Sequence, residues 1–477
     1  MFQSYLIRAI GTHRGAPRLY LDGAFLASTA FQPGTAYSVR ADENGERLVL
    51  HIDPHGRRVV SSKVKGGHSC SVIDINNRTD LEAFVGVATA RVVITQHELY
   101  VLIPASERNR RERLRRLIHQ LQASKSVRTA SLAHGVGVMS HACHQGLSQA
   151  GVAANLAMAN EIDPHFVGQA KEFNDSWNNQ TRAIASPIQE MVQDRWLLGR
   201  LGPVEIVEAG IPCSGASKAG KSKRGLLHME GHPEVGHLIA PTIMAIAHLQ
   251  PVCFVLENVP DYATSASADI LRMMLRDMGY SSHETLLNGR DHGCHEGRVR
   301  WFFVAMTNGI DLDLRDVKSL GVVQESIESK LDDVPLDDPR WRTFEHLRDK
   351  ESRDAAKGDS FAMQIVSQED SHVPTLRKGY QKAGSTDPLL RHPVDPQRLR
   401  LFTPAEHARF KGVPIHLVEG LADTRAHQGL GQSVTYQAVV SLFEVIGKAL
   451  MKFAESSRHD SFSAATRPQY QLAQATG

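Results

Sequence analysis

From about residue 128 onward, short apolar runs of strand length alternate with longer stretches of helical periodicity. The runs include "EIVEAGIP" (205–212), "VCFVLENV" (252–259) and "RWFFVAM" (300–306), and "HLIAPTIMAIAHLQ" (237–250) is typical of the helices. This alternation predicts an α/β fold with a parallel sheet. Open sheets of this kind bind ligands at the carboxyl ends of their strands. Side chains near these strand ends are therefore the first candidates for a functional site.

Residues 16–104 follow a different pattern, in which apolar and polar positions alternate between turn signals. Asn44-Gly45 lies between two such runs and predicts a hairpin. We expect a small β-rich domain, followed by a helix over "SERNRRERLRRLIHQLQ" (106–122). Six arginines crowd into residues 108–116 of that helix. They form either a solvated helix face or a patch that contacts phosphate.

Charge and cysteine content exclude several classes of protein. The 54 Lys and Arg against 52 Asp and Glu give a net charge of +2, which implies no particular partner. The five cysteines are widely spaced and include no Cys-x-x-Cys pair, so neither a disulfide framework nor a zinc site is expected. No apolar run in the sequence reaches membrane-spanning length, and the first residues lack a signal-peptide core. We expect a cytoplasmic protein without a membrane or metal partner.

The stretch "GASKAGKSK" (215–223) matches the Gly-x4-Gly-Lys-Ser pattern of nucleotide-binding P-loops. A P-loop needs a helix that starts at the Lys-Ser pair, because phosphate sits at the helix N-terminus. The residues that follow contain Gly225, Gly231, Pro233 and Gly236. An interior glycine costs a helix about 1 kcal/mol and a proline about 3 kcal/mol. We therefore expect a loop and no ATP site.

Reactive side chains lie at the ends of the three apolar runs. Cys213 directly follows the first run, Glu257 and Asn258 lie near the end of the second, and Arg298 and Arg300 stand at the start of the third. A lone buried cysteine is usually a packing residue. A carboxylate at a sheet edge is costly unless it is paired, so Glu257 gives the cysteine functional support.

At six places, in the same order, the chain resembles the DNA cytosine-5 methyltransferase family. "GIPCSGASKAGK" (210–221) resembles the catalytic Pro-Cys loop, which absorbs the P-loop-like stretch, and "LENV" (256–259) resembles Glu-Asn-Val. "EGRVR" (296–300) resembles Gln-x-Arg-x-Arg, with Glu296 in place of glutamine. Three later motifs are resembled by "VPTLRKGYQKAGSTDP" (373–388), "RLRLFTPAEHARFKGVP" (398–414) and "GLGQSVTYQAV" (429–439). The likeness covers about residues 128–450.

Residues 131–163 resemble the start of the family's cofactor-binding region. The resemblance implies S-adenosyl-L-methionine as the cofactor and no metal. It also implies a set of cofactor-binding residues: His134, Gly135, Val136, Gly137, Glu161, Ile162, Ser186, Gln432 and Ser433. Glu161 would accept hydrogen bonds from ribose hydroxyls, as such an acid does in dinucleotide folds. Several positions depart from the family: Ser131 and Ser186 replace aspartate, Ala133 replaces phenylalanine and Gln432 replaces asparagine.

The resemblance also implies a reaction at carbon 5 of a cytosine that is flipped out of the duplex. Cys213 would add to carbon 6 as a thiolate, and Glu257 would protonate or hydrogen-bond the ring at N3. Arg298 would hold the carbonyl oxygen of the base and Arg300 would brace the loop. Either arginine could instead form a structural ion pair. The sequence does not identify the base that removes the carbon 5 proton.

"TPAEHARFKG" (403–412) also has a complete structural interpretation. Thr403 would cap a helix, Pro404 would take its first position, Glu406 would close a capping box and Gly412 would end the helix. Glu406 and Arg409 are therefore either functional residues or parts of the scaffold.

The predicted fold is α/β: a Rossmann-like S-adenosylmethionine-dependent methyltransferase sheet with an inserted target-recognition domain and a small β-rich N-terminal domain. We expect a β-rich accessory domain with its basic connector helix (1–125) and a catalytic cofactor-binding domain (126–309). A target-recognition domain (310–400), the C-terminal part of the catalytic domain (401–457) and a disordered tail (458–477) follow.

The expected function is methylation of cytosine in a specific sequence of double-stranded DNA, in a cytoplasmic protein associated with the nucleoid. A companion restriction endonuclease would be a further partner in a restriction–modification system. Two alternatives stay open. One is a tRNA cytosine-5 methyltransferase, although the Cys-Phe-Thr element of that branch is absent from the sequence. The other is a catalytically silent DNA-binding protein on the same scaffold.

Overall fold

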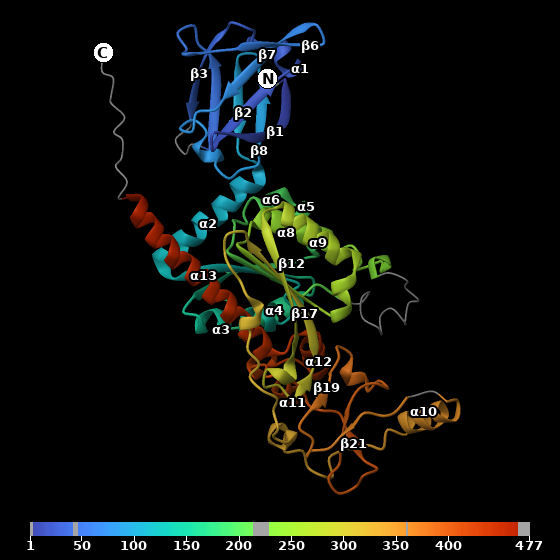
Figure 1. Cartoon of the computed structure of the whole chain (residues 1–477). Helices are drawn as coiled ribbons and strands as arrows, with labels where there is room; N and C mark the ends of the chain where they lie inside the picture. Colours follow the sequence, from blue (N-terminus) through green and yellow to red (C-terminus); the bar gives the residue numbers. More distant parts are fainter. Residues whose placement is uncertain (1–2, 42–45, 213–228, 359–360, 466–477) are drawn as a thin grey trace. The chain divides into compact units, whose positions relative to one another are not determined.

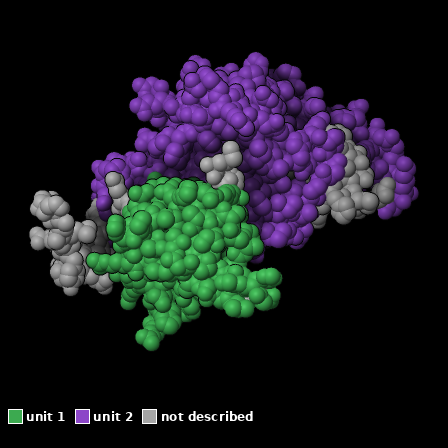
Figure 2. Space-filling view, turned by 90° about the horizontal axis from the view of Figure 1, so that it is seen from above, with its two compact units in different colours: residues 1–112 green, residues 113–477 purple. Residues whose placement is uncertain are grey.

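The computed structural model describes residues 3–41, 46–212, 229–358 and 361–465 (Figure 1). The chain forms two compact units, residues 1–112 and 113–477, which are green and purple in Figure 2. The boundary falls inside α2 (Ala105–Ser124). Within the described ranges no single helix is long and apolar enough to cross a membrane. One bent pair, Asp423–Gln432 with Tyr436–Ser457, passes a test of length and composition alone.

Unit 1 is built on a nine-stranded antiparallel sheet in the order β5-β3-β4-β9-β8-β1-β2-β7-β6. β3 (Ala36–Ala41) and β4 (Arg47–Ile52) pair on the two sides of Asn44-Gly45, as predicted, although residues 42–45 lie outside the described ranges. The other strands are β1 (Ser4–His13), β2 (Ala16–Asp22), β5 (Arg58–Val59), β6 (Ser61–Lys65), β7 (His68–Ile75), β8 (Thr89–Ile94) and β9 (Glu98–Leu102). Short helices α1 (Ala24–Ala27) and η1 (Glu82–Phe84) complete the unit.

Unit 2 contains a seven-stranded sheet in the order β12-β11-β10-β13-β14-β17-β15. Five strands are parallel: β10 (Ser126–Leu132), β11 (Ala153–Glu161), β12 (Arg182–Ala185), β13 (Ile206–Ala209) and β14 (Cys253–Asn258). β17 (Val299–Thr307) runs antiparallel to both β14 and β15 (Tyr280–Asn288). The expectation of a parallel sheet is therefore wrong for β17. Residues 289–298 are too few for the crossover that a parallel strand needs, and hold only η4 (Gly289–Asp291) and β16 (Glu296–Gly297) as described elements.

Helices cover both faces of this sheet, as Figure 1 shows. One apolar cluster joins the sheet to α3 (Val138–Gln149), α13 (Tyr436–Ala465) and the end of α2. A second joins the opposite face to α5 (Ile188–Gln193), α8 (Ile239–Leu249) and α9 (Ala266–Asp277). The shorter helices of this part are α4 (Pro164–Phe173), α6 (Arg195–Leu198), η2 (Met229–Gly231) and η3 (Pro260–Thr264).

α3 and α13 pack unusually closely, because glycine stands at their contact. A Cβ atom added at Gly146 would lie 2.3 Å from the carbonyl oxygen of Val440. α13 also continues to Ala465, past residue 458 where we expected the tail to begin. No glycine or proline interrupts the sequence between Gly447 and Pro468, so local sequence does not stop the helix at residue 458. Residues 466–477 lie outside the described ranges.

Two arginines of α2, Arg113 and Arg116, have their partners inside unit 2. At these two positions the arginine-rich segment is neither a solvated face nor a phosphate patch. Arg113 is fully buried, donates a hydrogen bond to Thr307 Oγ1 (3.0 Å) and lies 4.1 Å from the ring centre of Tyr280. Arg116 pairs with the buried Glu205 at 2.7 Å. These two arginines fix the helix to the sheet of unit 2, because the interior offers them partners that a sequence pattern does not show.

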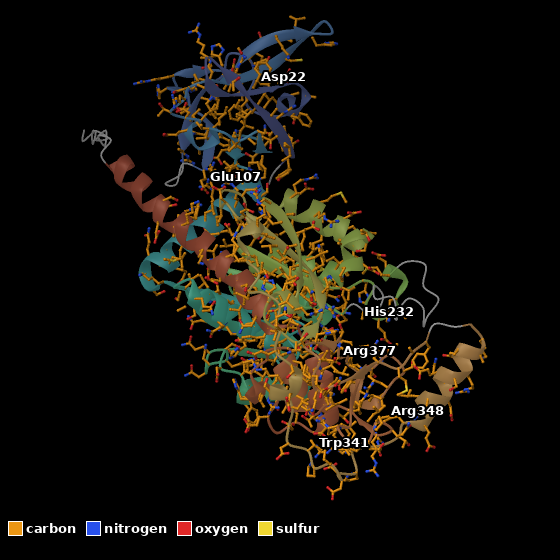
Figure 3. The ribbon with its side chains drawn as sticks, turned by 60° about the horizontal axis from the view of Figure 1, so that its bottom comes forward. Asp22, Glu107, His232, Trp341, Arg348 and Arg377 are labelled. Carbon is orange, nitrogen blue, oxygen red and sulfur yellow. The ribbon has the colours of Figure 1, made fainter. Side chains whose placement is uncertain are left out.

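Residues 310–400 form short elements around a small apolar core that they share with Phe402 and Phe410. The elements are η5 (Leu314–Asp316), η6 (Ile327–Lys330), α10 (Glu345–Ala356), β18 (Ile365–Val366), β19 (Val373–Pro374), η7 (Tyr380–Lys382), β20 (Leu389–Arg391) and β21 (Leu399–Arg400). Trp341, labelled in Figure 3, is buried in this core beneath the guanidinium of Arg400, 5.0 Å from its ring centre. β19 pairs with β16, which returns the segment to the sheet edge.

The chain then forms α11 (Pro404–Phe410), η8 (Ile415–Val418) and α12 (Asp423–Gln432). The predicted capping box of α11 is confirmed, because Thr403 and Glu406 exchange side-chain to backbone hydrogen bonds. Glu406 also pairs with Arg400 at 2.6 Å, and Arg409 pairs with Asp332 at 2.6 Å. Both residues left open by the sequence thus hold scaffold ion pairs.

Candidate active site

The loop after β10 has a backbone that favours glycine. Gly135 and Gly137 have φ values of 58° and 81°. A Cβ atom at Gly137 would lie 2.3 Å from Asn174 Nδ2, so a side chain does not fit there. A Cβ atom at Gly135 would meet no described atom within 4 Å. The predicted glycines therefore form a tight turn with open space beside one of them.

Glu161, at the end of β11, closes this turn. Its Oε2 accepts a hydrogen bond from the Gly135 amide (2.7 Å), and its Oε1 accepts one from the Asp163 amide (3.0 Å). Each carboxylate oxygen keeps a second lone pair for a ligand hydroxyl. The neighbouring Ile162 is apolar yet 66% exposed. Ser186 follows β12 at the same edge, with its hydroxyl group at the surface.

Glu257, at the end of β14, is buried and pairs with the partly buried Arg300. Its Oε1 is 2.8 Å from Arg300 Nε. Its Oε2 would lie 3.9 Å from a Cβ atom at Gly210, so the carboxylate is beside the backbone three residues before Cys213. The antiparallel direction of β17 explains the pairing, because it brings the start of that strand to the carboxyl end of β14.

Arg298 is buried next to this pair and reaches α12. Its Nη2 donates a hydrogen bond to the carbonyl oxygen of Gly431 at 3.2 Å. Two residues earlier in α12, a Cβ atom at Gly429 would lie 3.0 Å from Val136 Cγ1. α12 thus contacts the glycine turn through Gly429 and Arg298 through Gly431. It connects the turn with the group formed by Glu257, Arg298 and Arg300. Gln432 is exposed at the end of this helix, and Ser433 caps it by donating to the Leu430 carbonyl oxygen (2.7 Å).

A second ion pair lies behind Arg298. Lys411 Nζ is 3.2 Å from Glu296 Oε1, and both side chains are fully buried. Arg298 Nη1 is 3.7 Å from the same oxygen. Burial, aided by repulsion from Arg298, lowers the pKa of Lys411 to about 7. The pair supports Arg298 from the interior.

The sequence profile of the C-5 cytosine-specific DNA methylase family matches residues 127–448. The chain belongs to this family. Family membership confirms the resemblance seen in the six motifs.

Characterised relatives are Type II methyltransferases. M.MspI of Moraxella sp is 24% identical over 266 residues, which are 54% of this chain and 59% of the relative. M.HpaII of Haemophilus parainfluenzae is 26% identical over 278 residues, which are 52% of this chain and 72% of the relative. The chain thus spans about three fifths of M.MspI.

Solved structures with a similar fold are also methyltransferases. S. pombe Dnmt2 methyltransferase aligns with a TM-score of 0.52 at 19% identity, over 69% of this chain and 99% of that one. Entamoeba histolytica methyltransferase EhMeth aligns with a TM-score of 0.53 at 16% identity, over 70% and 99%. At these identities the likeness shows the fold alone, an α/β methyltransferase fold with a mixed sheet.

The predicted nucleophile of this methylase-family chain, Cys213, lies outside the described residues. Lys221 and Ser222 of the P-loop-like stretch lie there as well. The strand that leads to them is present as β13, and it ends at Ala209. The remaining predicted residues all lie at or near the carboxyl edge of the sheet, in the two groups that α12 connects.

Sequence reasoning missed a buried carboxyl group behind the glycine turn. Glu208, on β13, is directly opposite Ser131 of β10, the position where the family has aspartate. Burial raises the pKa of Glu208 to about 8, so this carboxyl group is mostly protonated at neutral pH. Ser131 Oγ is in turn 2.7 Å from His134 Nδ1. The sequence signal that could have identified it is the carboxylate of Glu208 inside the apolar run "EIVEAGIP".

Proposed function

We propose that this chain transfers a methyl group to carbon 5 of cytosine in a specific sequence of double-stranded DNA. The observation that carries the proposal is the ion pair of the buried Glu257 with Arg300 beside Gly210. Gly210 lies three residues before the proposed nucleophile Cys213, and the pair lies at the sheet edge that also holds the Gly135–Gly137 turn. A carboxyl group and a thiol on neighbouring strand ends are what covalent activation of a pyrimidine ring requires.

The residues around the turn fit S-adenosyl-L-methionine, which we propose as the cofactor. Gly135 leaves open space, Ile162 offers an exposed apolar surface for an adenine ring and Glu161 keeps lone pairs for ribose hydroxyls. We include His134, Val136, Gly137, Ser186, Gln432 and Ser433 in the same proposed site. The bound cofactor would supply an electrophilic methyl group.

In the proposed mechanism the thiolate of Cys213 adds to carbon 6 of the flipped base. Negative charge moves onto the ring, where the carboxyl group of Glu257 supplies a proton or hydrogen bond at N3. Arg298 donates to the carbonyl oxygen of the base, and Arg300 holds Glu257 in place. Carbon 5 thereby becomes nucleophilic. Removal of its proton after methylation returns the electrons of the C–S bond to sulfur and frees Cys213.

We further propose that residues 310–400 recognise the DNA sequence, with residues 1–125 as an accessory domain. The segment reaches the proposed site through Gly431, where an added Cβ atom would lie 2.3 Å from the carbonyl carbon of Arg377. Arg377 and Lys378 are both exposed, and Figure 3 labels Arg377. Exposed cations on a loop beside the site suit phosphate and base-edge contacts. Because the relatives are Type II methyltransferases, a companion restriction endonuclease is part of the proposal.

Substitution of the cysteine tests the activity. Cys213→Ser should abolish methyl transfer to duplex DNA while retaining S-adenosylmethionine binding in calorimetry. Cys70→Ser is the matched control, because Cys70 lies on β7 of unit 1 and should keep full activity. Transfer by the Cys213 variant near the wild-type rate would overturn the mechanism. A wild-type chain that binds no S-adenosylmethionine would instead indicate a silent DNA-binding scaffold.

A segment exchange tests the domain roles. Grafting residues 310–400 from a relative of different specificity should transfer that specificity. Removing residues 1–104 should weaken DNA binding without changing the methylated sequence. The deletion stops before α2, since Arg113 and Arg116 of that helix are fixed in unit 2. If the graft keeps the original target and the deletion loses it, the two roles are reversed.

A further inference from the structure

Three side chains from separate parts of unit 2 converge near the start of α13. They are His141 on α3, Asp175 after α4 and His416 on η8, and their ligand atoms all lie within 4.8 Å of one another. His416 Nε2 is 3.3 Å from Asp175 Oδ2, and His141 Nε2 is 3.7 Å from the same oxygen. Two imidazoles and one carboxylate are a common ligand set for divalent transition metals.

The spacing of these atoms suits a tetrahedral ion. Zn²⁺ binds imidazole nitrogen and carboxylate oxygen at about 2.0–2.2 Å, which places neighbouring ligand atoms about 3.3–3.5 Å apart. The separations from Asp175 Oδ2, 3.3 and 3.7 Å, are close to that value, and the two imidazole nitrogens lie within 4.8 Å of each other, so a modest closure brings all three atoms to that geometry. Asp175 is well exposed, so water can complete the coordination.

The surroundings prepare both imidazoles to act as ligands. His141 Nδ1 lies 2.6 Å from the hydroxyl group of Tyr436, the first residue of α13. A Nδ1–H that donates to this oxygen leaves the Nε2 lone pair free to bind a metal, as in many zinc sites. Burial lowers the pKa of His141, which favours the neutral, ligating form. His416 Nε2 is shielded from solvent and makes no hydrogen bond to the described residues.

We propose that His141, Asp175 and His416 bind one Zn²⁺ ion. The ion would join α3, the turn after α4 and η8. That turn contains Asn174, whose Nδ2 donates to the carbonyl oxygens of Val136 and Gly137. The metal would therefore hold the glycine turn in place and take no part in the chemistry. The expectation of no metal rested on cysteine spacing and on the family resemblance, and neither reflects these histidines, which are distant in the sequence.

Metal binding by the full chain, purified without a histidine tag and stripped with a chelating resin, tests the site. Calorimetric titration with Zn²⁺ should give one equivalent per chain, and Co²⁺ should give the visible absorption of a tetrahedral site. Asp175→Asn should weaken Zn²⁺ binding by about 100-fold or more, and Tyr436→Phe by about 10- to 100-fold. His119→Ala, an exposed histidine on α2, should change nothing.

A second readout is thermal stability. Zn²⁺ should raise the unfolding temperature of the wild-type chain and leave that of Asp175→Asn unchanged. Because the Asp175 side chain is 77% exposed, this variant should fold without the metal. No binding by the wild-type chain would overturn the proposal and show a plain histidine–aspartate network. Binding that Asp175→Asn leaves unchanged would also overturn it and place the ion elsewhere.

Discussion

Replacing Lys411 by methionine should leave the Glu296 carboxylate in the interior without its nearest cation. Both side chains are fully buried, and Lys411 Nζ lies 3.2 Å from Glu296 Oε1. Removing one member of a buried ion pair costs about 3–5 kcal/mol, mainly because the other charge stays buried. Arg298, 3.7 Å from the same oxygen, offsets part of this loss. We therefore expect the free energy of unfolding to fall by about 3 kcal/mol.

The matched control removes both charges at once. Glu296→Gln with Lys411→Gln leaves two neutral side chains that can hydrogen-bond, and glutamine is the residue of the resembled motif at position 296. Replacing a whole buried pair by neutral groups is often nearly free, so the double variant should lie within about 1 kcal/mol of wild type. The two sites touch, so their effects should be strongly non-additive.

The pair should also make stability depend on pH. Lys411 in the folded chain has a pKa of about 7, whereas the ordinary value is 10.5. Between these values the unfolded chain binds more protons, so raising the pH stabilises the folded state. Between pH 7 and 10.5, the free energy of unfolding of wild type should rise relative to that of the double variant, by up to about 1.4 kcal/mol per pH unit.

Urea denaturation followed by tryptophan fluorescence reports on the unfolding of unit 2, which contains the Lys411–Glu296 pair. All four tryptophans, residues 177, 196, 301 and 341, belong to residues 113–477. A loss below about 1 kcal/mol in Lys411→Met would refute the argument that the pair is buried and coupled. Equal losses in the single and double variants would refute it as well, since they would point to lost packing.

Three further predictions concern single side chains. Gly431→Ala should push the loop of Arg377 away, lower stability by about 1–3 kcal/mol in urea and weaken DNA binding, whereas Gly168→Ala, with no described atom near the added Cβ, should do neither. Glu208→Gln should become more stable relative to wild type as the pH rises from about 5 to 8 in urea titrations, because the folded carboxyl group, with its raised pKa of about 8, keeps its proton in this range while the unfolded chain releases it, which destabilises wild type. Lys221→Ala should leave nucleotide binding unchanged, and saturable ATP binding by wild type in calorimetry would contradict the loop assignment.

Local signals in the sequence predicted local structure well. The Asn44-Gly45 hairpin, the helix α2 and the capping box of α11 each depend on residues a few positions apart, and the structure has all three. The strand-like runs before Cys213 and through Glu257 also form strands. Such signals need no knowledge of the tertiary fold.

Features set by distant contacts were not predictable in the same way. The direction of β17 depends on its short connection to β15, and that direction brings Arg300 to Glu257. Arg113 looked like part of a surface patch, yet the interior supplies its partners. Glu296 was visible in the sequence only as a departure from the resembled motif, and only the fold shows that Lys411 compensates it.

The close packing of α3 against α13 has a consequence for synthesis of the chain. His141 on α3 and Tyr436 on α13 are 295 residues apart in the sequence, yet the second helix covers the first. The ribosome therefore releases α3 long before its cover exists, and the apolar face of α3 stays exposed throughout that interval. Products that stop before α13 cannot bury this face, and exposed apolar surface is what chaperones and proteases recognise. The catalytic unit is thus completed only by its late helix, which makes accumulation of partial chains unfavourable.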